Sequence, residues 1–320
     1  MTLPVDPGLS VISEGQALGD HEPDSRFSDL QDCFTKRGSN MMIHEINNGY
    51  KVSQINKTDL RPLLIDNLRE TLPIYSPTYE ETAMRAYVRE RLLAGGWDVT
   101  SDCMGNVMAV RGECPIAGYI QLNAHMDTCQ SEDDQDIRES LRYDEDQGIF
   151  LAENPDGDRR QMGADDKAGI GIILALARGT DLPFKILFTV REEEGQQGVQ
   201  EVPPDFYADC AFGLTLDRKG RGDIISTYHG RTCAPDHIVT NLMSLAKEEG
   251  MDYWKTCGGS IADTYYTAEF IPALNISTGY YNPHTCFDYI RVDETYGALR
   301  LAKACIEHPE HLLHRPAASD

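Results

Sequence analysis

The sequence predicts an α/β fold, and two observations support that class. Short runs of β-branched and apolar residues alternate along the chain with stretches that have the apolar spacing of amphipathic helices. One run, 119–123, is largely apolar and leads directly to His125. A buried central strand that ends at a polar side chain is the geometry expected where an open α/β sheet binds a ligand. The sequence therefore favours a sheet covered by helices, with a site at the carboxyl ends of its strands.

The individual elements follow from the same patterns. Helices are expected over 58–72, 78–94, 169–176, 236–249 and 293–306, and strands over 97–100, 106–111, 119–123, 184–190, 210–216, 223–228 and 273–278. The second helix is predicted to start at a capping box, Thr78 to Glu81, in which each side chain would bond the backbone N–H of the other residue. Gly95 and Gly96 would end this helix.

The chain is expected to hold a single catalytic domain, 58–310, with additions at both ends. Residues 1–40 are rich in Asp, Gly, Pro and Ser and predict a poorly ordered acidic leader. Residues 41–57 contain Asn-Asn-Gly and are a candidate hairpin appendage, and 311–320 form a tail. Within the domain, the acidic run 131–136 is expected to be a solvated surface loop.

The charge balance argues against two classes of partner. The 320 residues include 29 Lys and Arg against 52 Asp and Glu, and the net charge of −23 disfavours attraction to nucleic acid or to an anionic membrane. No run approaches the roughly 18 to 20 apolar residues that span a bilayer. The first residues lack the features of a signal peptide, so a cytoplasmic location is expected. Nine cysteines without a Cys-x-x-Cys pair predict reduced thiols. The oligomeric state stays open.

Five residues are candidate metal ligands, and each follows a β-type run or opens a helix. A hydrolytic centre with two metals needs ligands from several directions and an anionic bridge that offsets the repulsion between the cations. Asp165 is the candidate bridge. The first metal would also take His125 and Asp217. The second metal would also take Glu193 and His284.

Two more residues are assigned roles in catalysis. Adjacent Glu192 and Glu193 cannot point the same way on an extended segment, so one of them is left free. Glu192 would be the general base that takes a proton from a water between the metals and passes it to the leaving amine. Glu194 is the alternative base if the register differs by one residue. Asp127 is expected to hydrogen-bond the nitrogen of His125 that does not bind metal, which would fix the tautomer.

Four polar residues are weaker candidates for contacts with a substrate. Tyr280 and Tyr281 precede His284 and could donate a hydrogen bond to a tetrahedral oxyanion, although a packing role is the alternative. Arg231 and Arg291 could bind a substrate carboxylate through two hydrogen bonds each. The alternative for both arginines is a solvated place on the surface.

The motifs that carry these residues resemble the peptidase T-like group of di-zinc metallopeptidases, within the clan of zinc aminopeptidases and carboxypeptidases. The matching segments are His125-Met-Asp-Thr, Gly163-Ala-Asp-Asp-Lys-Ala-Gly-Ile, Phe188-Thr-Val-Arg-Glu-Glu-Glu-Gly and His284-Thr. The resemblance runs from about Ser76 to Ile306. It implies a three-layer α/β/α catalytic domain with a mixed, mostly parallel central sheet, two zinc ions, and exopeptidase or amide-hydrolase activity. It also implies a cis peptide bond between Asp165 and Asp166.

One domain of those enzymes is not expected in this chain. They insert a separate lid and dimerisation domain between the residues that match Asp217 and His284. Here the interval is only the 66 residues 218–283, which read as ordinary elements of the catalytic domain. The chain is therefore more similar to the lidless aminopeptidases of the clan, and dimerisation through a lid is not implied.

The function expected from the motifs is that of a zinc-dependent exopeptidase acting on small peptides. An aminopeptidase is favoured, because the lid is lacking and an acidic rim attracts a free α-ammonium group. The first alternative is an amidohydrolase that deacylates N-acyl amino acids with the same metals. The second is a non-catalytic binding protein built on a peptidase scaffold. A phosphoesterase would need a cradle of Arg and Lys near the ligands, and the sequence shows none.

Overall fold

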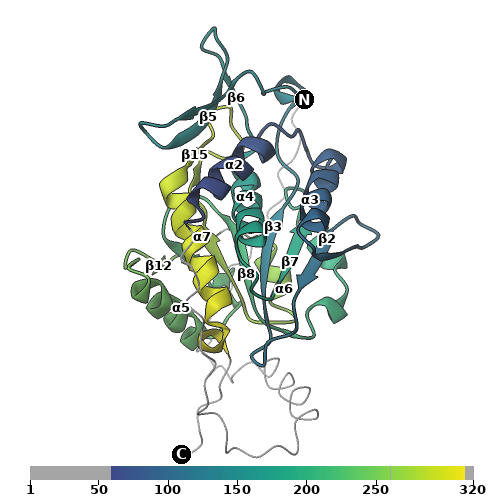
Figure 1. Cartoon of the computed structure of the whole chain (residues 1–320), viewed down its shortest axis with the longest axis vertical. Coiled ribbons are helices and arrows are strands. Elements are labelled where there is room, and N and C mark those ends of the chain that lie inside the picture. Colours follow the sequence, from purple (N-terminus) through teal and green to yellow (C-terminus); the bar gives the residue numbers. More distant parts are fainter. Residues whose placement is uncertain (1–58, 260, 314–320) are drawn as a thin grey trace, which may run out of the picture. The chain divides into compact units, whose positions relative to one another are not determined.

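The computed structural model describes residues 59–259 and 261–313, and its centre is an eight-stranded sheet (Figure 1). The predicted leader at 1–40 and hairpin at 41–57 lie outside the described residues, as does all but the start of the predicted tail at 311–320. In the order in which they pair, the strands are β1 (Asp98–Ser101), β2 (Val107–Arg111), β7 (Phe184–Thr189), β3 (Tyr119–His125), β8 (Cys210–Arg218), β13 (Ala273–Ser277), β9 (Asp223–Ile225) and β12 (Lys255–Thr256).

Parallel pairing dominates the middle of this sheet. β3 runs parallel to β7 on one side and to β8 on the other, and β8 runs parallel to β13. Antiparallel pairs join β1 to β2, β2 to β7, and β9 to β13. β3 is buried along its whole length, as its apolar sequence predicts. The predicted mixed, mostly parallel sheet is therefore confirmed.

Long helices cover one face of the sheet (Figure 1). They are α2 (Arg61–Thr71), α3 (Thr82–Ala94), α4 (Ala164–Gly179), α5 (Asp236–Glu248) and α7 (Val292–Glu307). α4 is the central one, since it packs against β3 and β8 and contacts both α2 and α7. Gly171 lets α2 come close, because a β-carbon there would lie 2.8 Å from the Leu68 side chain. Among the described residues, no helix combines the length and the apolar character needed to cross a membrane.

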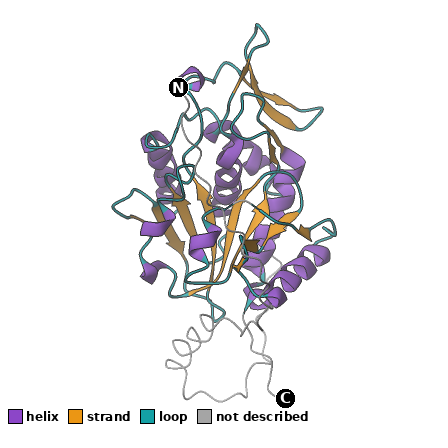
Figure 2. Cartoon of the chain, turned by 180° about the vertical axis from the view of Figure 1, so that it is seen from behind, coloured by secondary structure: helices purple, strands orange, loops and turns teal. Residues whose placement is uncertain are grey.

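The opposite face of the sheet carries shorter helical elements, on the side seen in Figure 2. They are α6 (Thr264–Thr267), η3 (Val199–Glu201) and η4 (Pro204–Phe206). A separate small core with Met108, Leu187 and Tyr207 lies under them. The predicted three-layer α/β/α class is confirmed, with one thick and one thin helical layer.

A second, smaller sheet is a feature that the sequence did not predict. It consists of β14 (Tyr280–Tyr281), β15 (Tyr289–Arg291), β5 (Ile149–Glu153), β4 (Leu141–Asp144) and β6 (Arg159–Arg160). The loop that carries His284 connects β14 to β15, so this sheet supports one of the candidate ligands. In the acidic run 131–136, which was expected to be a solvated loop, every residue except Asp134 is exposed.

The interval between Asp217 and His284 belongs to the catalytic domain throughout its described residues. β9, β12 and β13 are strands of the main sheet, and α5 packs beside α7. β10 (Thr227–Tyr228) and β11 (Arg231–Thr232) form a two-stranded ribbon. The predicted strand at 223–228 is therefore divided into two. The described part of this interval contains no separate lid, in agreement with the sequence.

The predicted capping box of α3 is wrong. α3 begins at Thr82 after a cap residue, Glu81, that makes no side-chain capping bond. The hydroxyl of Thr78 donates to Oδ2 of Asp127 at 2.9 Å instead. The Glu81 carboxylate accepts from the backbone N–H of Tyr79 at 3.0 Å. Thr78 therefore supports a residue of the candidate site rather than a helix end.

Candidate metal centre

The structure brings all five predicted ligands to one edge of the main sheet. His125 is the last residue of β3, Asp217 lies near the end of β8, and Glu193 follows β7. Because these three strands are adjacent and parallel, their carboxyl ends place the three side chains together. Asp165 comes from the start of α4, and His284 comes from the loop between β14 and β15.

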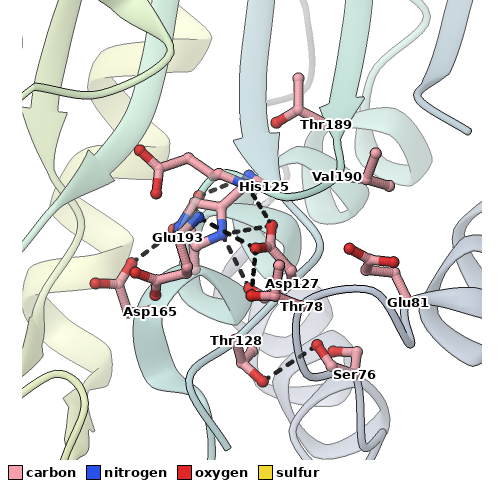
Figure 3. Close-up of polar contacts among 12 residues, drawn as sticks. Ser76, Thr78, Glu81, His125, Asp127, Thr128, Asp165, Thr189, Val190 and Glu193 are labelled. Atoms are coloured by element: carbon pink, nitrogen blue, oxygen red, sulfur yellow. Dashed lines mark hydrogen bonds and ion pairs between the residues drawn. The ribbon is translucent and has the colours of Figure 1, made fainter. Parts of the chain in front are cut away.

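Asp165 lies in the middle of this cluster, between two histidines. Its Oδ1 is 3.1 Å from Nε2 of His125, and its Oδ2 is 3.4 Å from Nε2 of His284. Nε2 of His284 is also 3.0 Å from Oε1 of Glu193, which Figure 3 shows beside Asp165 and His125. Nε2 of His125 is 3.8 Å from Oδ1 of Asp217. One carboxylate thus offers one oxygen toward each histidine, an arrangement compatible with a ligand shared by two metals.

The hydrogen bond at Nδ1 assigns the tautomer of His125. Nδ1 lies 2.9 Å from the backbone carbonyl oxygen of Asp127, which can only accept, so Nδ1 carries a proton. In a neutral ring, Nε2 is then an acceptor that faces the carboxylates of Asp165 and Asp217. Burial alone would lower the pKa of His125, but these acids and Asp127 raise it well above its usual value. A nitrogen lone pair that faces carboxylate oxygens needs a proton or a cation between them, so the geometry fits a metal site.

Three carboxylates lie close together at this edge of the sheet. Oxygens of Asp165, Asp166 and Asp217 lie within 4.8 Å of one another. Burial, together with the charge of Asp165, raises the pKa of Asp217 to about 7. Burial and the charge of Asp217 also raise the pKa of Asp166 well above its usual value. A bound cation would let these groups stay ionised together. The combination of His, Asp and Glu donors is one that divalent metals bind, so the cluster is compatible with a metal site.

The turn that carries Asp165 is tied to the end of β3. The peptide bond between Asp165 and Asp166 is cis, as the resemblance implies. The buried Asp166 carboxylate accepts from the backbone N–H groups of His125 at 3.3 Å and Gly169 at 3.0 Å. Gly169 leaves room for this contact, because a β-carbon there would lie 2.6 Å from both carboxylate oxygens of Asp166.

Two buried charged residues hold the segment that precedes Asp165. The ammonium group of Lys167 donates to the carbonyl oxygens of Leu72 at 3.1 Å and Met162 at 2.6 Å. The carboxylate of Asp288 accepts from the backbone N–H groups of Met162 at 3.0 Å and Ala164 at 2.9 Å. Asp288 is four residues beyond His284, so it connects two segments that supply ligands. Sequence reasoning missed Asp288, since only the tertiary structure shows its partners.

Asp127 has partners that differ in part from the predicted ones. Its carboxylate accepts from the backbone N–H groups of Glu192 at 2.9 Å and Glu193 at 3.1 Å, and from the hydroxyl of Thr78. The distance from this carboxylate to Nδ1 of His125 is 3.6 Å, and the short bond to the imidazole comes from the carbonyl of Asp127 instead. Figure 3 shows Asp127 between His125 and Thr78. Asp127 therefore positions the two glutamates as well as the imidazole.

Glu192 and Glu193 serve different neighbours. Glu193 lies against His284 and also within 4.8 Å of donor atoms of His125 and Asp165, whereas Glu192 lies within 4.8 Å of donor atoms of His125 and Asp217. Glu192 is only 7% exposed, and this burial raises the pKa of its carboxyl group well above its usual value. Nε2 of Gln196 donates to Oε1 of Glu192 at 3.0 Å, a contact that the sequence did not predict.

Of the four weaker candidates, one lies in the cluster. The hydroxyl of Tyr280 donates to Oδ1 of Asp217 at 3.2 Å. The hydroxyl of Tyr281 bonds a glutamate of α7 instead. Arg231 forms an ion pair with a glutamate that follows α6, and Arg291 lines a different cavity, beside the start of α7. Neither arginine is therefore placed to bind a substrate carboxylate at the cluster.

A cavity of about 480 Å³ opens over the cluster. Glu192 and four of the predicted ligands line it, namely Asp165, Glu193, Asp217 and His284. Ile261, Ala262 and Pro283 add apolar surface, and Arg218 and Lys219 add cationic side chains. The volume lies within the range of sites that hold small molecules. The sequence did not single out these five additional residues, because they come from three separate segments.

Comparisons with known proteins found matches to the structure. No protein-family model and no curated protein matches the sequence. The aminopeptidase PepT of Bacillus cereus gives a TM-score of 0.65 at 15% identity, over 77% of this chain and 98% of that one. A tripeptidase of Staphylococcus aureus gives 0.63 at 16%, over 77% and 99%. An aminopeptidase of the archaeon Desulfurococcus kamchatkensis gives 0.61 at 17%, over 81% and 99%. The chain shares its fold with these peptidases.

This shared fold confirms the resemblance that the motifs indicated. It also explains why residues from distant segments meet, since the carboxyl ends of parallel strands form the binding edge of such a sheet. At 15 to 17% identity, the likeness shows the fold alone. The activity has to be argued from the side chains of the cluster.

Proposed function

We propose that this protein is a zinc-dependent exopeptidase that hydrolyses the amide bonds of small peptides. The observation that carries the proposal is the Asp165 carboxylate between two histidines, with the free carboxylate of Glu192 beside them. Asp165 would be shared by two zinc ions. The first would also be held by His125 and Asp217, and the second by Glu193 and His284. When bound, the metals would supply Lewis acidity toward the scissile carbonyl and would make water acidic enough to attack at neutral pH.

In this proposal Glu192 moves the proton. A carboxylate with a raised pKa, placed beside the ligands, can take a proton from the attacking water and then deliver it to the leaving amine. The backbone N–H of Glu192 is held by Asp127, and its side chain is held by Gln196. Both contacts restrict the base to one position over the cluster. Tyr280 holds the carboxylate of Asp217 in a similar way.

Replacing Gln196 should disturb the base without removing it. Gln196→Met keeps the length of the side chain but loses the hydrogen bond to Glu192. A donor to a carboxylate favours its ionised form, so its loss should raise the pKa of Glu192. The acid limb of kcat/KM should then move to higher pH, and kcat should fall about tenfold. Gln135→Met makes the same change at an exposed glutamine away from the cluster and should leave the pH profile in place. An unmoved acid limb in Gln196→Met would contradict this role.

An aminopeptidase is favoured among the exopeptidases. The described part of the chain contains no lid between Asp217 and His284, and acidic residues line the cavity, which suits a free α-ammonium group. Two of the three similar structures are named aminopeptidases, and the third is named a tripeptidase. An amidohydrolase that deacylates N-acyl amino acids would use the same residues. A non-catalytic binding protein is the remaining alternative.

A substrate panel separates these functions. The purified protein, supplied with zinc, should release amino acids from neutral di- and tripeptides with free amino termini, and should act more slowly on N-acetylated copies of the same peptides. Faster release from N-acetyl amino acids would favour the amidohydrolase. If neither class is cleaved with zinc, cobalt or manganese, although metal binds, the protein is a binding protein and the proposed activity is wrong.

A further inference from the structure

Two cationic residues extend the wall of the cavity directly beyond a candidate ligand. Arg218 and Lys219 follow Asp217 at the end of β8, and both line the cavity over the cluster. The other charged residues of the lining are the acids and the histidine of the proposed metal centre. The acids of the lining favour cations, whereas Arg218 and Lys219 favour an anionic group.

Neither cation is neutralised by a strong ion pair within the described part of the chain. The guanidinium of Arg218 is partly exposed, and its Nη2 is 3.5 Å from Oδ2 of Asp223, which is a long contact. The side chain of Lys219 is exposed, and its ammonium group forms no ion pair or hydrogen bond with any described residue. Both groups are therefore available to an anion that enters the cavity. Arg and Lys together suit a carboxylate, because the guanidinium can bind both oxygens and the ammonium adds a second charge.

The position of Glu192 indicates where the leaving residue of a substrate would lie. As the proposed base, Glu192 must lie within hydrogen-bonding reach of the leaving nitrogen. Its carboxylate is within 4.8 Å of that of Asp217, the residue that precedes Arg218. Glu192, Arg218 and Lys219 line the same cavity, so a residue released beside Glu192 would lie in the cavity that the two cations also line.

From these placements we infer that Arg218 and Lys219 bind a carboxylate on the leaving residue of the substrate. The inference rests on the proposed function and narrows its substrate class. The preferred substrates are short, with a free carboxylate one residue beyond the scissile bond, as in a dipeptide or an N-acyl amino acid. The carboxylate can be the terminal α-carboxylate or the side chain of an acidic leaving residue, since both present the same group.

Matched substrate pairs test the inference. Ala-Leu and Ala-Leu-amide differ only in the terminal carboxylate, and Ala-Asp-amide and Ala-Asn-amide differ only in a side-chain carboxylate. For at least one pair, kcat/KM should favour the carboxylate by about tenfold to a hundredfold, the effect expected of a charge-assisted hydrogen bond. The pair that shows the preference identifies the source of the carboxylate. N-acetyl-leucine and its amide give the same comparison if the protein is a deacylase.

Variants then assign the preference to the two cations. Lys219→Glu reverses an exposed charge. The ratio of kcat/KM between the two substrates of the preferred pair should then fall close to one, mainly because KM for the carboxylate substrate rises. Arg218→Gln, which keeps polar contacts at the partly buried position, should lower the same ratio. Lys247→Glu makes the same charge reversal at an exposed position of α5 and should leave the ratio unchanged.

The outcomes separate the inference from the function on which it rests. If both members of every pair are cleaved equally, the inference is wrong and the peptidase function stands. A preference that survives in Lys219→Glu and Arg218→Gln would also overturn it. If no peptide and no N-acyl amino acid is cleaved by the zinc-loaded protein, both the inference and the proposed function are wrong.

Discussion

Replacing Glu192 by Gln should abolish nearly all turnover and leave the metal content unchanged. The substitution keeps the size of the side chain and the backbone bond to Asp127, but an amide cannot accept the proton of the attacking water. General acid–base groups contribute on the order of a hundredfold to ten-thousandfold in rate, and kcat of Glu192→Gln should fall by that amount. Steady-state assays with a cleaved dipeptide, together with metal analysis of the purified variant, measure both quantities.

Glu194→Gln is the matched control for this experiment. Glu194 is exposed and belongs to none of the donor clusters among the described residues, so its variant should retain wild-type kcat. Loss of activity in Glu194→Gln with an active Glu192→Gln would assign the base to Glu194 and contradict the geometry. Loss of metal from Glu192→Gln would instead make Glu192 a ligand.

Replacing Asp165 by Asn should remove most of the metal affinity. Asp165 is the carboxylate that approaches both His125 and His284, and an amide offers one neutral oxygen in place of two charged ones. Loss of a residue that merely orients a ligand costs about tenfold to a hundredfold in affinity, so loss of the bridge should cost more. Titration calorimetry with zinc measures the affinity directly.

Thermal unfolding gives a second measure of the same loss. A metal that binds the folded state raises Tm with its concentration, so zinc should raise Tm of the wild type and should have little effect on Asp165→Asn. Asp133→Asn makes the same chemical change in the exposed acidic run and should respond to zinc as the wild type does. An Asp165→Asn protein that still binds two zinc ions tightly would show that the bridge lies elsewhere.

Much of the architecture could be predicted from local patterns. The strands that lead to His125, Glu193 and Asp217 are apolar and flanked by clear turns, so their positions could be predicted from the sequence. Parallel strands bring their carboxyl ends to one edge, and that rule alone placed three candidate ligands together. The residues that the motifs indicated as ligands do meet in the structure.

The parts that could not be predicted depend on contacts between distant segments. The small sheet joins β5 to β15, which are separated by more than a hundred residues, and no local pattern indicates that pairing. Gln196 and Asp288 acquire their importance from partners that only the fold brings near. The sequence alone does not distinguish Arg218 and Lys219 from ordinary surface residues, because only the structure shows the cavity that they line.

The failed capping box has a similar physical cause. Thr78 and Glu81 match the local pattern for a helix start, yet Thr78 bonds Asp127, which is 49 residues away. Asp127 is fully buried, so its carboxylate depends on protein donors such as the Thr78 hydroxyl, whereas water can reach the first helical residues, Thr82 and Ala83. A local capping pattern therefore fails to predict the structure where a distant residue of the site binds the same side chain.

The central claim is that Asp165 bridges two metals held by His125, Asp217, Glu193 and His284. A crystal structure of the zinc-loaded protein, with anomalous difference maps on both sides of the zinc absorption edge, tests it most directly. The account predicts two zinc peaks, one beside His125 and Asp217 and the other beside Glu193 and His284, with one oxygen of Asp165 at each. A single peak, or peaks that Asp165 does not contact, would contradict it.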